Sequence, residues 1–331
     1  MSQMSFSDAE YAGKRKQTRR EVFLAEMEQV VPWDALLALI EPEYPKAGRG
    51  RRPYALMTML RIHLMQNWFG YSDPAMEEAL YEVAPLRRFA GLSLTRGSLP
   101  DETTILNFRH LLEKHELAPK LLAAVNEHLG DKGLLLRQGT IVDATIIHAP
   151  PSTKNKDRAR DPDMHQTRKG QQWYFGMKAH IGADVESGLV HTVTTTPANV
   201  SDVSETEKLL HGNEESVHCD AGYTGADKRE ELKDNKAQWH IAARRGTIKA
   251  MPEGELKEAT QTLETIKAAI RARVEHPFRV IKCQFGYRKV RFKGLVKNTA
   301  QIVVLFALSN LWMVRKKLLS MTAELRPQGA G

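Results

Sequence analysis

The 331-residue sequence predicts an α/β protein in which a mixed sheet, with helices on both of its faces, follows an all-helical N-terminal domain. Two observations predict this class. Up to about residue 130 apolar residues recur at helical spacing, and from about residue 139 β-branched runs alternate with helical segments. At about 150 residues per domain, the length also suits two domains. We therefore expect domains at residues 1–130 and 131–320, and a flexible tail at residues 321–331.

Apolar spacing and capping residues predict the helices of the N-terminal domain. Leu56, Leu60 and Leu64 are four residues apart, so they lie on one face of a helix. Ser72 and Asp101 stand where helices begin, and their side-chain oxygens can accept hydrogen bonds from backbone N–H groups of the first turn. The predicted helices cover residues 54–68, 73–83, 86–90, 101–116 and 119–129.

Strand signals begin after Gly139. Glu186-Ser187-Gly188 is a tight-turn sequence between two β-rich runs, which predicts a hairpin. Strands are expected at residues 140–147, 175–185, 189–196, 216–220 and 239–243. Helices are expected at residues 202–210, 226–235, 255–274 and 299–319, and loops at residues 148–174 and 247–254. Three consecutive strands followed by alternating helices and strands predict a mixed sheet, and this is the element order of the RNase H-like fold.

The composition restricts the class of protein. Lysine and arginine number 48 against 40 acidic residues, and the net charge of +8 favours a polyanionic partner. Two cysteines cannot build a disulfide framework, and no cysteine or histidine spacing indicates a zinc site. The most apolar run, residues 302–308, is far shorter than the roughly 20 residues that span a bilayer. With no recognisable signal peptide, we expect a soluble intracellular protein that does not bind membranes.

The positive charge is concentrated in residues 271–297. This segment holds nine lysines and arginines and one acidic residue, Glu275, so its charge equals that of the whole chain. Aromatic residues are interleaved with the basic ones, as in surfaces that bind phosphates and stack on bases. A solvated face with core aromatics is the alternative. A second basic tract, residues 154–169, is interpreted either as a phosphate-binding loop or as a solvated linker.

Three acidic residues are candidates for a metal site. Asp143 interrupts an apolar strand, where a charge is costly unless it is paired or bound to metal. Asp220 ends another strand, and Glu275 ends the long helical segment. Hard carboxylate oxygens suit Mg²⁺ or Mn²⁺, and two such ions can clamp a phosphodiester. Each acid could instead be a structural group or a cap. Asp184, beside the hairpin turn, and Asp202, a predicted helix cap, are the competing acids.

Several sequence blocks resemble those of insertion-sequence DDE transposases, specifically the insertion-sequence-five family. The likeness extends over about residues 5–320. Three blocks lie in the helical domain, at residues 50–54, 72–77 and 100–105. Four more lie in the second domain, at residues 142–147, 173–182, 220–223 and 271–279, the last with Lys282. The wider group has a tyrosine where this chain has Ala268, so a tyrosine role is missing there.

The resemblance implies an RNase H-like catalytic domain that cuts and joins DNA with two divalent ions, Mg²⁺ or Mn²⁺. It implies that Asp143, Asp220 and Glu275 form the metal-binding catalytic triad. It also implies that Arg271 and Lys282 contact DNA near the cleaved phosphate. The expected partners are double-stranded transposon terminal inverted repeats, target DNA and further copies of the chain in a synaptic complex. The expected location is the bacterial cytoplasm, in association with the nucleoid.

Five other residues are weaker candidates for DNA contacts. Arg273 and Arg279 belong to the basic segment, and Lys178 is placed to contact phosphate. His180 is interpreted first as a packing or hydrogen-bonding group, and Trp173 either stacks on an unpaired base or belongs to the core.

Two alternative functions stay open. The first is a non-catalytic DNA-binding regulator that uses residues 72–116 as a helix-turn-helix-like unit. The second is a stand-alone nuclease of the same fold, which cuts DNA without joining it.

Overall fold

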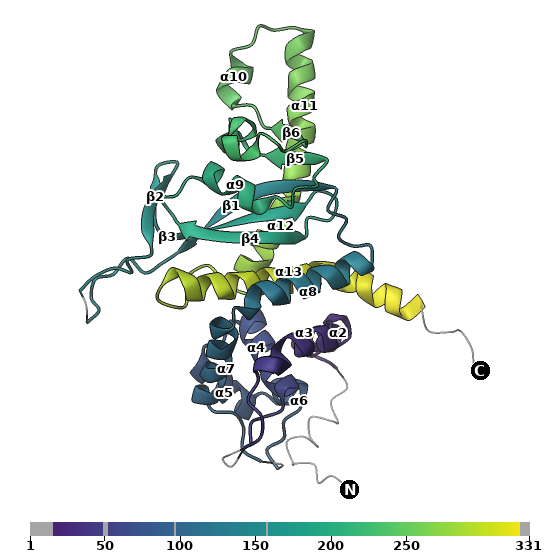
Figure 1. Cartoon of the computed structure of the whole chain (residues 1–331), viewed down its shortest axis with the longest axis vertical. Helices are drawn as coiled ribbons and strands as arrows, with labels where there is room; N and C mark the ends of the chain where they lie inside the picture. The colour runs from purple at the N-terminus through teal and green to yellow at the C-terminus, as the bar shows by residue number, and fades with distance from the viewer. Residues whose placement is uncertain (1–15, 49–51, 96, 157, 325–331) are drawn as a thin grey trace. The chain divides into compact units, whose positions relative to one another are not determined.

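The computed structural model describes residues 16–48, 52–95, 97–156 and 158–324 (Figure 1). The described chain divides into two compact units: one up to residue 125 together with residues from 307 onward, and one of residues 126–306. Part of the predicted tail, residues 325–331, lies outside the described residues. So do residues 50 and 51, which belong to the transposase-like sequence block at residues 50–54.

The first unit is all-helical, as predicted. Ser72 accepts a hydrogen bond from the N–H of Ala75 at 3.3 Å, and Asp101 accepts one from that of Thr104 at 2.7 Å, so both caps form. The core contains Trp68, which is 2% exposed. Its helices are α2 (Arg19–Val30), α3 (Trp33–Ile40), the 3₁₀ turn η1 (Glu41–Glu43), α4 (Leu56–Phe69), α5 (Asp73–Glu82), α6 (Ala84–Phe89), α7 (Glu102–Lys114) and most of α8 (Leu117–Asp131).

The last helix contributes to both units. It is predicted at residues 299–319 and found as α13 (Leu295–Glu324), so it continues past the expected start of the tail. Its second half belongs to the helical unit, where the Nε of Arg315 donates to Glu26 at 2.9 Å. No helix in the described parts of the chain is long and apolar enough to cross a membrane.

The second unit is built on a six-stranded mixed sheet (Figure 1). Its order is β2-β3-β1-β5-β6, and β4 also pairs with β3. Strand β3 is antiparallel to β1, β2 and β4, whereas β5 and β6 extend the sheet in parallel from β1. This is the predicted RNase H-like arrangement. The strands are β1 (Gly139–His148), β2 (His165–Lys169), β3 (Gln172–Asp184), β4 (Val190–Pro197), β5 (Ser216–Cys219) and β6 (Gln238–Ile241).

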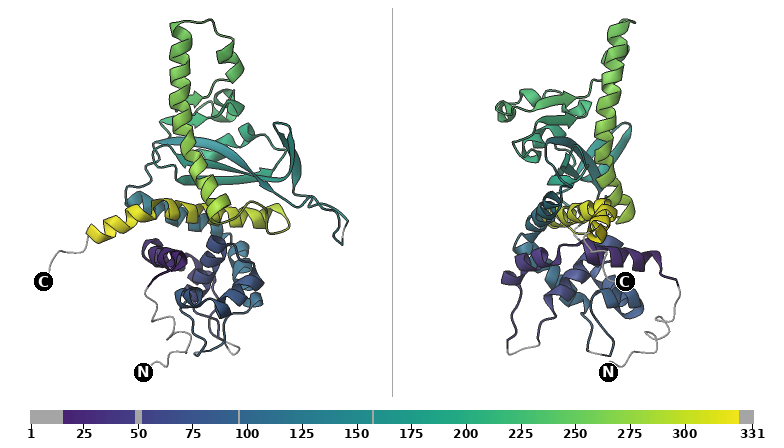
Figure 2. Two further views of the ribbon diagram at one scale, coloured as in Figure 1. Left: turned by 180° about the vertical axis from the view of Figure 1, so that it is seen from behind. Right: turned by 90° about the vertical axis from the view of Figure 1, so that its right-hand side faces the viewer.

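Helices lie on both faces of the sheet. The long helix α11 packs against β5, and the turn η6 that follows it packs against β1 (Figure 2). On the other face, α9 packs against β3 and β4. The remaining elements are the 3₁₀ turns η2 (Asp202–Glu205) and η3 (Ala221–Tyr223), α9 (Thr206–Leu209), α10 (Arg245–Lys249), α11 (Glu255–Arg271), η6 (Ala272–Val274), α12 (Glu275–Arg279) and the π-helical turn η7 (Val280–Gln284).

Several local predictions were wrong. Residues 226–235 form two 3₁₀ turns, η4 (Ala226–Lys228) and η5 (Glu230–Leu232), because Arg229 between them is extended. Part of the expected loop 247–254 belongs to α10, and the expected loop 148–174 contains β2 and the start of β3. Asp202 is not a helix cap: Ser201 precedes the turn, and Asp202 instead pairs with Lys178.

Candidate active site

The parallel pairing of β1 and β5 brings Asp143 and Asp220 to the same level of the sheet. Val142 is paired with Cys219, so the next residue on each strand is an aspartate. In parallel strands, paired residues project to the same face, and ligand sites form where strands end. The register thus places two carboxylates side by side at the end of β5.

Asp143 is a half-buried carboxylate whose charge is costly. Its Oδ1 accepts a hydrogen bond from the N–H of Ala144 at 2.7 Å. Burial, with the negative charges of Asp220 and Glu275, raises the pKa of Asp143 to about 7, against the opposing effects of the Ala144 hydrogen bond and of Arg271. The three acids therefore share one electrostatic neighbourhood.

Asp220 both caps a turn and faces Asp143. Its Oδ1 accepts from the N–H of Gly222 at 2.8 Å and begins η3. A Cβ at Gly222 would lie 2.9 Å from the same oxygen, which explains why glycine suits this position. The structural interpretation of Asp220 as a cap is therefore correct, and it is compatible with a second role, because a carboxylate has acceptor capacity on both oxygens.

Glu275 reaches this neighbourhood from the helical segment. It is exposed at the start of α12, after α11 and η6. A pocket of about 230 Å³ lies between β1 and this segment. Asp143, Arg271 and Glu275 line it, together with Ala268. A small residue thus borders the pocket where the wider family group has a tyrosine.

The donor set fits divalent cations. No group of three His, Cys, Asp or Glu side chains within the described residues is close enough to enclose a metal ion. Mg²⁺, however, commonly takes one or two carboxylates and completes its shell with waters and substrate phosphates. Asp143 and Glu275 line one pocket, and Asp220 adds negative charge beside it. A cation there would offset the burial and the repulsion that together raise the pKa of Asp143.

Lys282 is attached to β1 just beyond Asp143. Its Nζ donates to Thr145 Oγ1 at 2.5 Å and to the carbonyl oxygen of Ile146 at 3.0 Å. Burial lowers the pKa of Lys282, Lys169 lowers it further, and Glu275 opposes the shift. The lysine therefore positions the segment that carries Glu275 against the strand that carries Asp143. Thr145 is a partner that the sequence did not reveal.

Arg273 and Arg279 have different surroundings. Arg273 donates to the carbonyl oxygen of Val185 and lies 3.9 Å from Glu186, at the turn between β3 and β4. Arg279 is exposed on α12. Arg273 thus holds the hairpin turn, whereas Arg279 is available at the surface.

Lys178 and His180 lie on the opposite face of the sheet from Asp143. The Nζ of Lys178 is 2.9 Å from Asp202 and donates to Val200 O at 2.7 Å. The ring of His180 is fully buried, with Nε2 2.8 Å from the hydroxyl of Thr196. Burial lowers the pKa of His180 to about 4. The structure does not bring these two residues together with the three acids.

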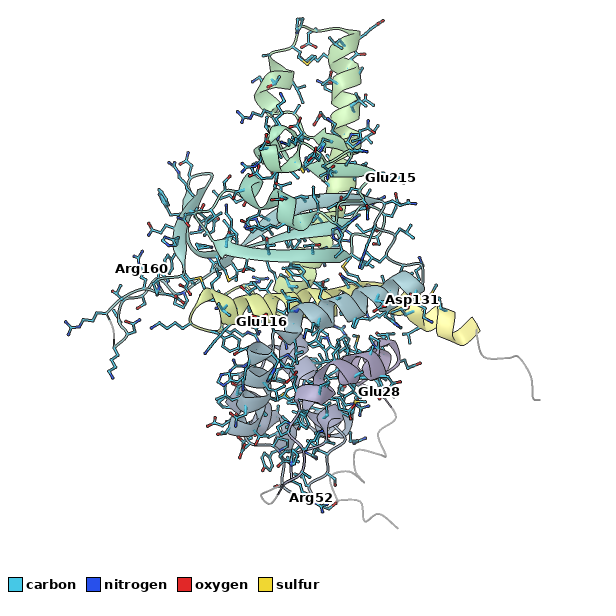
Figure 3. All side chains as sticks on the ribbon, in the orientation of Figure 1. Glu28, Arg52, Glu116, Asp131, Arg160 and Glu215 are labelled. Atoms are coloured by element: carbon cyan, nitrogen blue, oxygen red, sulfur yellow. The ribbon has the colours of Figure 1, made fainter. Side chains whose placement is uncertain are left out.

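The hairpin of β2 and β3 forms a basic and aromatic surface. Trp173 is 64% exposed and is paired across the hairpin with Arg168, which rules out its assignment to the core. Lys169 of the same hairpin acts electrostatically on Lys282, so this surface lies near Lys282. Arg160 extends from the loop between β1 and β2 (Figure 3). Strand β2 was missed because its sequence, His-Gln-Thr-Arg-Lys, contains no apolar residue.

Comparison with known proteins gives two family matches. Residues 135–311 match the family described as transposase DDE domain, and residues 12–111 match the family described as transposase domain (DUF772). Among solved structures, the piggyBac transposase synaptic complex with hairpin DNA is similar with a TM-score of 0.47 and 10% sequence identity. That match covers 94% of this chain and 79% of the other.

Proposed function

Because the chain belongs to the transposase DDE domain family, we propose that it is the DNA transposase of an insertion sequence, of the insertion-sequence-five type. Its substrates are the double-stranded terminal inverted repeats of its element and a target DNA, and it acts at the nucleoid in the bacterial cytoplasm. Residues 1–130 recognise DNA, and residues 131–320 carry the chemistry. The observation that supports this best is the register that sets Asp143 beside Asp220, with Glu275 in the same electrostatic neighbourhood.

Asp143, Asp220 and Glu275 would hold two Mg²⁺ or Mn²⁺ ions. When bound, such ions neutralise phosphate charge and activate the attacking oxygen. Arg271, which lines the pocket with Asp143 and Glu275, is placed to contact a phosphate that enters it. Lys282 keeps β1 and the segment that carries Glu275 at a fixed distance through its bonds to Thr145 and Ile146. The protein mainly positions groups and balances charge.

The reaction has two phosphoryl-transfer steps. In the first, water attacks the phosphodiester at the element end; a new P–O bond forms, the old one breaks, and the leaving group departs as a 3′-hydroxyl. In the second, that 3′-hydroxyl attacks a phosphodiester of target DNA and displaces another 3′-hydroxyl. No covalent protein intermediate is needed, and the exposed Trp173 and Arg279 are candidates to hold the DNA beside the pocket.

The test is cleavage of a labelled duplex that contains the element end, with Mg²⁺ or Mn²⁺. Asp143→Asn is expected to lower the cleavage rate at least about 100-fold, because it removes a negative oxygen from the ligand set. Asp234→Asn, the same change at an exposed turn, is the matched control and should cleave like wild type. Undiminished cleavage by Asp143→Asn would refute the assignment.

A second assay separates the alternatives. Addition of target DNA should yield joined products with wild type. Cleavage without joining would identify a stand-alone nuclease, whereas DNA binding without metal-dependent cleavage would identify a regulator.

A further inference from the structure

Helix α11 is attached to its own sheet by its polar side. Glu264 accepts a hydrogen bond from the N–H of Ala243 at 3.0 Å, and Lys267 donates to the carbonyl oxygen of Ile241 at 3.1 Å. Lys267 also donates to Glu264 at 2.8 Å. Lys257 is the one buried residue of α11. An amphipathic helix normally turns its apolar side toward the core, so α11 is mounted the opposite way.

The outer side of α11 carries an apolar stripe. Leu256, Leu263 and Ile266 are 75%, 58% and 53% exposed, and Ala259 is exposed between them. Their spacing of three and four residues is that of the a and d positions of a heptad, continued by Ile270. We call Leu256, Ala259, Leu263 and Ile266 the α11 seam.

The beginning of α11 has little support from its own unit. Both views of Figure 2 show it standing clear of the sheet, and Figure 1 shows α10 beside it. Helix α10 has no buried residue, so α10 and α11 share no core. A helix of this length is marginal in water without tertiary packing. The seam is therefore an apolar surface that is exposed on this projection.

We propose that the α11 seam binds the α11 seam of a second copy of this chain, with the two helices antiparallel. In the register that sets Leu256 against Ile266 of the second copy, Ala259 lies against Leu263. The helix begins with the acidic Glu255, and in this register Glu255 lies level with the basic Lys267 of the second copy. An antiparallel pair also opposes the helix dipoles.

The area of the seam limits the strength of this pairing. Seventeen helical residues extend over about 25 Å, so one helix face buries much less than the roughly 800 Å² per partner of a stable interface. The pair is therefore weak and concentration-dependent in free solution, and it strengthens where two copies are held close together. The pairing is independent of the proposed chemistry, and self-association can be measured without DNA.

Sedimentation velocity of the full chain from about 1 µM to about 100 µM tests the pairing. The sedimentation coefficient of wild type should rise with concentration. Leu263→Asp should weaken self-association at least about tenfold, because it places a charge in the seam. Gln261→Asp introduces the same residue at an exposed position outside the seam and should behave like wild type. A monomeric wild type, or equal self-association of Leu263→Asp and wild type, would overturn the proposal.

Disulfide formation tests the orientation. All proteins carry Cys283→Ser, because Cys283 is exposed. A mixture of Leu256→Cys and Ile266→Cys should crosslink, whereas neither variant should crosslink with itself. Self-crosslinking of each variant alone would overturn the antiparallel arrangement, and the absence of any crosslink would overturn the pairing. Metal-dependent end cleavage by Leu263→Asp is measured in parallel, since loss of the pairing and loss of the proposed function are then separate results.

Discussion

The two faces of the sheet handle their charges differently. On one face, Lys178 is paired with Asp202, and the carboxylate of Asp184 accepts three hydrogen bonds, from Arg137 N at 2.9 Å, Ser187 N at 2.8 Å and Ser187 Oγ at 2.6 Å. On the other face, Asp143 accepts one hydrogen bond from a backbone N–H and is close to two further acids. The face that carries Asp184 has its charges satisfied, whereas the face that carries Asp143 holds a carboxylate with a perturbed pKa, which is typical of functional sites.

The largest expected effect is on the face where the charges are satisfied. Asp184→Ala should lower the free energy of unfolding by about 3 kcal/mol, because it leaves three donors around a buried position without their acceptor. Urea unfolding of the metal-free protein measures this. Ser187→Ala, which removes one of the three donors, is the graded control and should cost about 1 kcal/mol. If Asp184→Ala lowered the free energy of unfolding by less than Ser187→Ala does, the comparison of the two faces would be contradicted.

On the face that carries Asp143, a substitution is expected to raise the free energy of unfolding instead of lowering it. The folded-state pKa of Asp143, about 7, lies above its ordinary value of 3.8, so the folded protein binds a proton that the unfolded chain releases. Stability from this group is therefore present at low pH and is lost as pH rises from about 4 through 7. Asp143→Asn should stabilise the metal-free protein by about 2 kcal/mol at pH 8 and should flatten this pH dependence. Urea unfolding at pH 5 and pH 8 tests it; equal loss of stability with pH in both proteins would argue against it.

The smallest effects separate two arginines of the basic segment. Arg279→Ala should reduce the slope of log affinity against log salt by about 1 without a change in melting temperature, because this exposed side chain is free to meet a phosphate. Arg273→Ala should cost about 1 kcal/mol of stability and leave the slope nearly unchanged, because its guanidinium already bonds Val185 O. Fluorescence anisotropy with duplex DNA at several salt concentrations measures both. The opposite assignment of the two effects would show that the hairpin turn is not where Arg273 acts.

Local signals in the sequence were sufficient for most elements. The caps at Ser72 and Asp101 each need only one side chain and the backbone N–H three residues later, so the local sequence predicts them without knowledge of the fold. The β-branched run that becomes β1 likewise predicted its strand. The prediction of a helix at residues 226–235 was wrong because the extended Arg229 interrupts a segment of helical composition. Strand β2 was missed because a strand that pairs in an exposed hairpin needs no apolar residue.

By itself, the sequence determined which residue types were present and in what local context: a charge inside an apolar strand, an aspartate after a second strand, and a basic segment around a single glutamate. Only the tertiary structure decided which of them meet. The pairing of Val142 with Cys219 joins segments far apart in the chain, and it alone sets Asp143 level with Asp220. A different pairing, that of Ile146 on β1 with Lys178 on β3, placed Lys178 on the far face, where it meets Asp202. Register and facing depend on long-range hydrogen bonding across the sheet, and a one-residue slip would move every side chain to the other face.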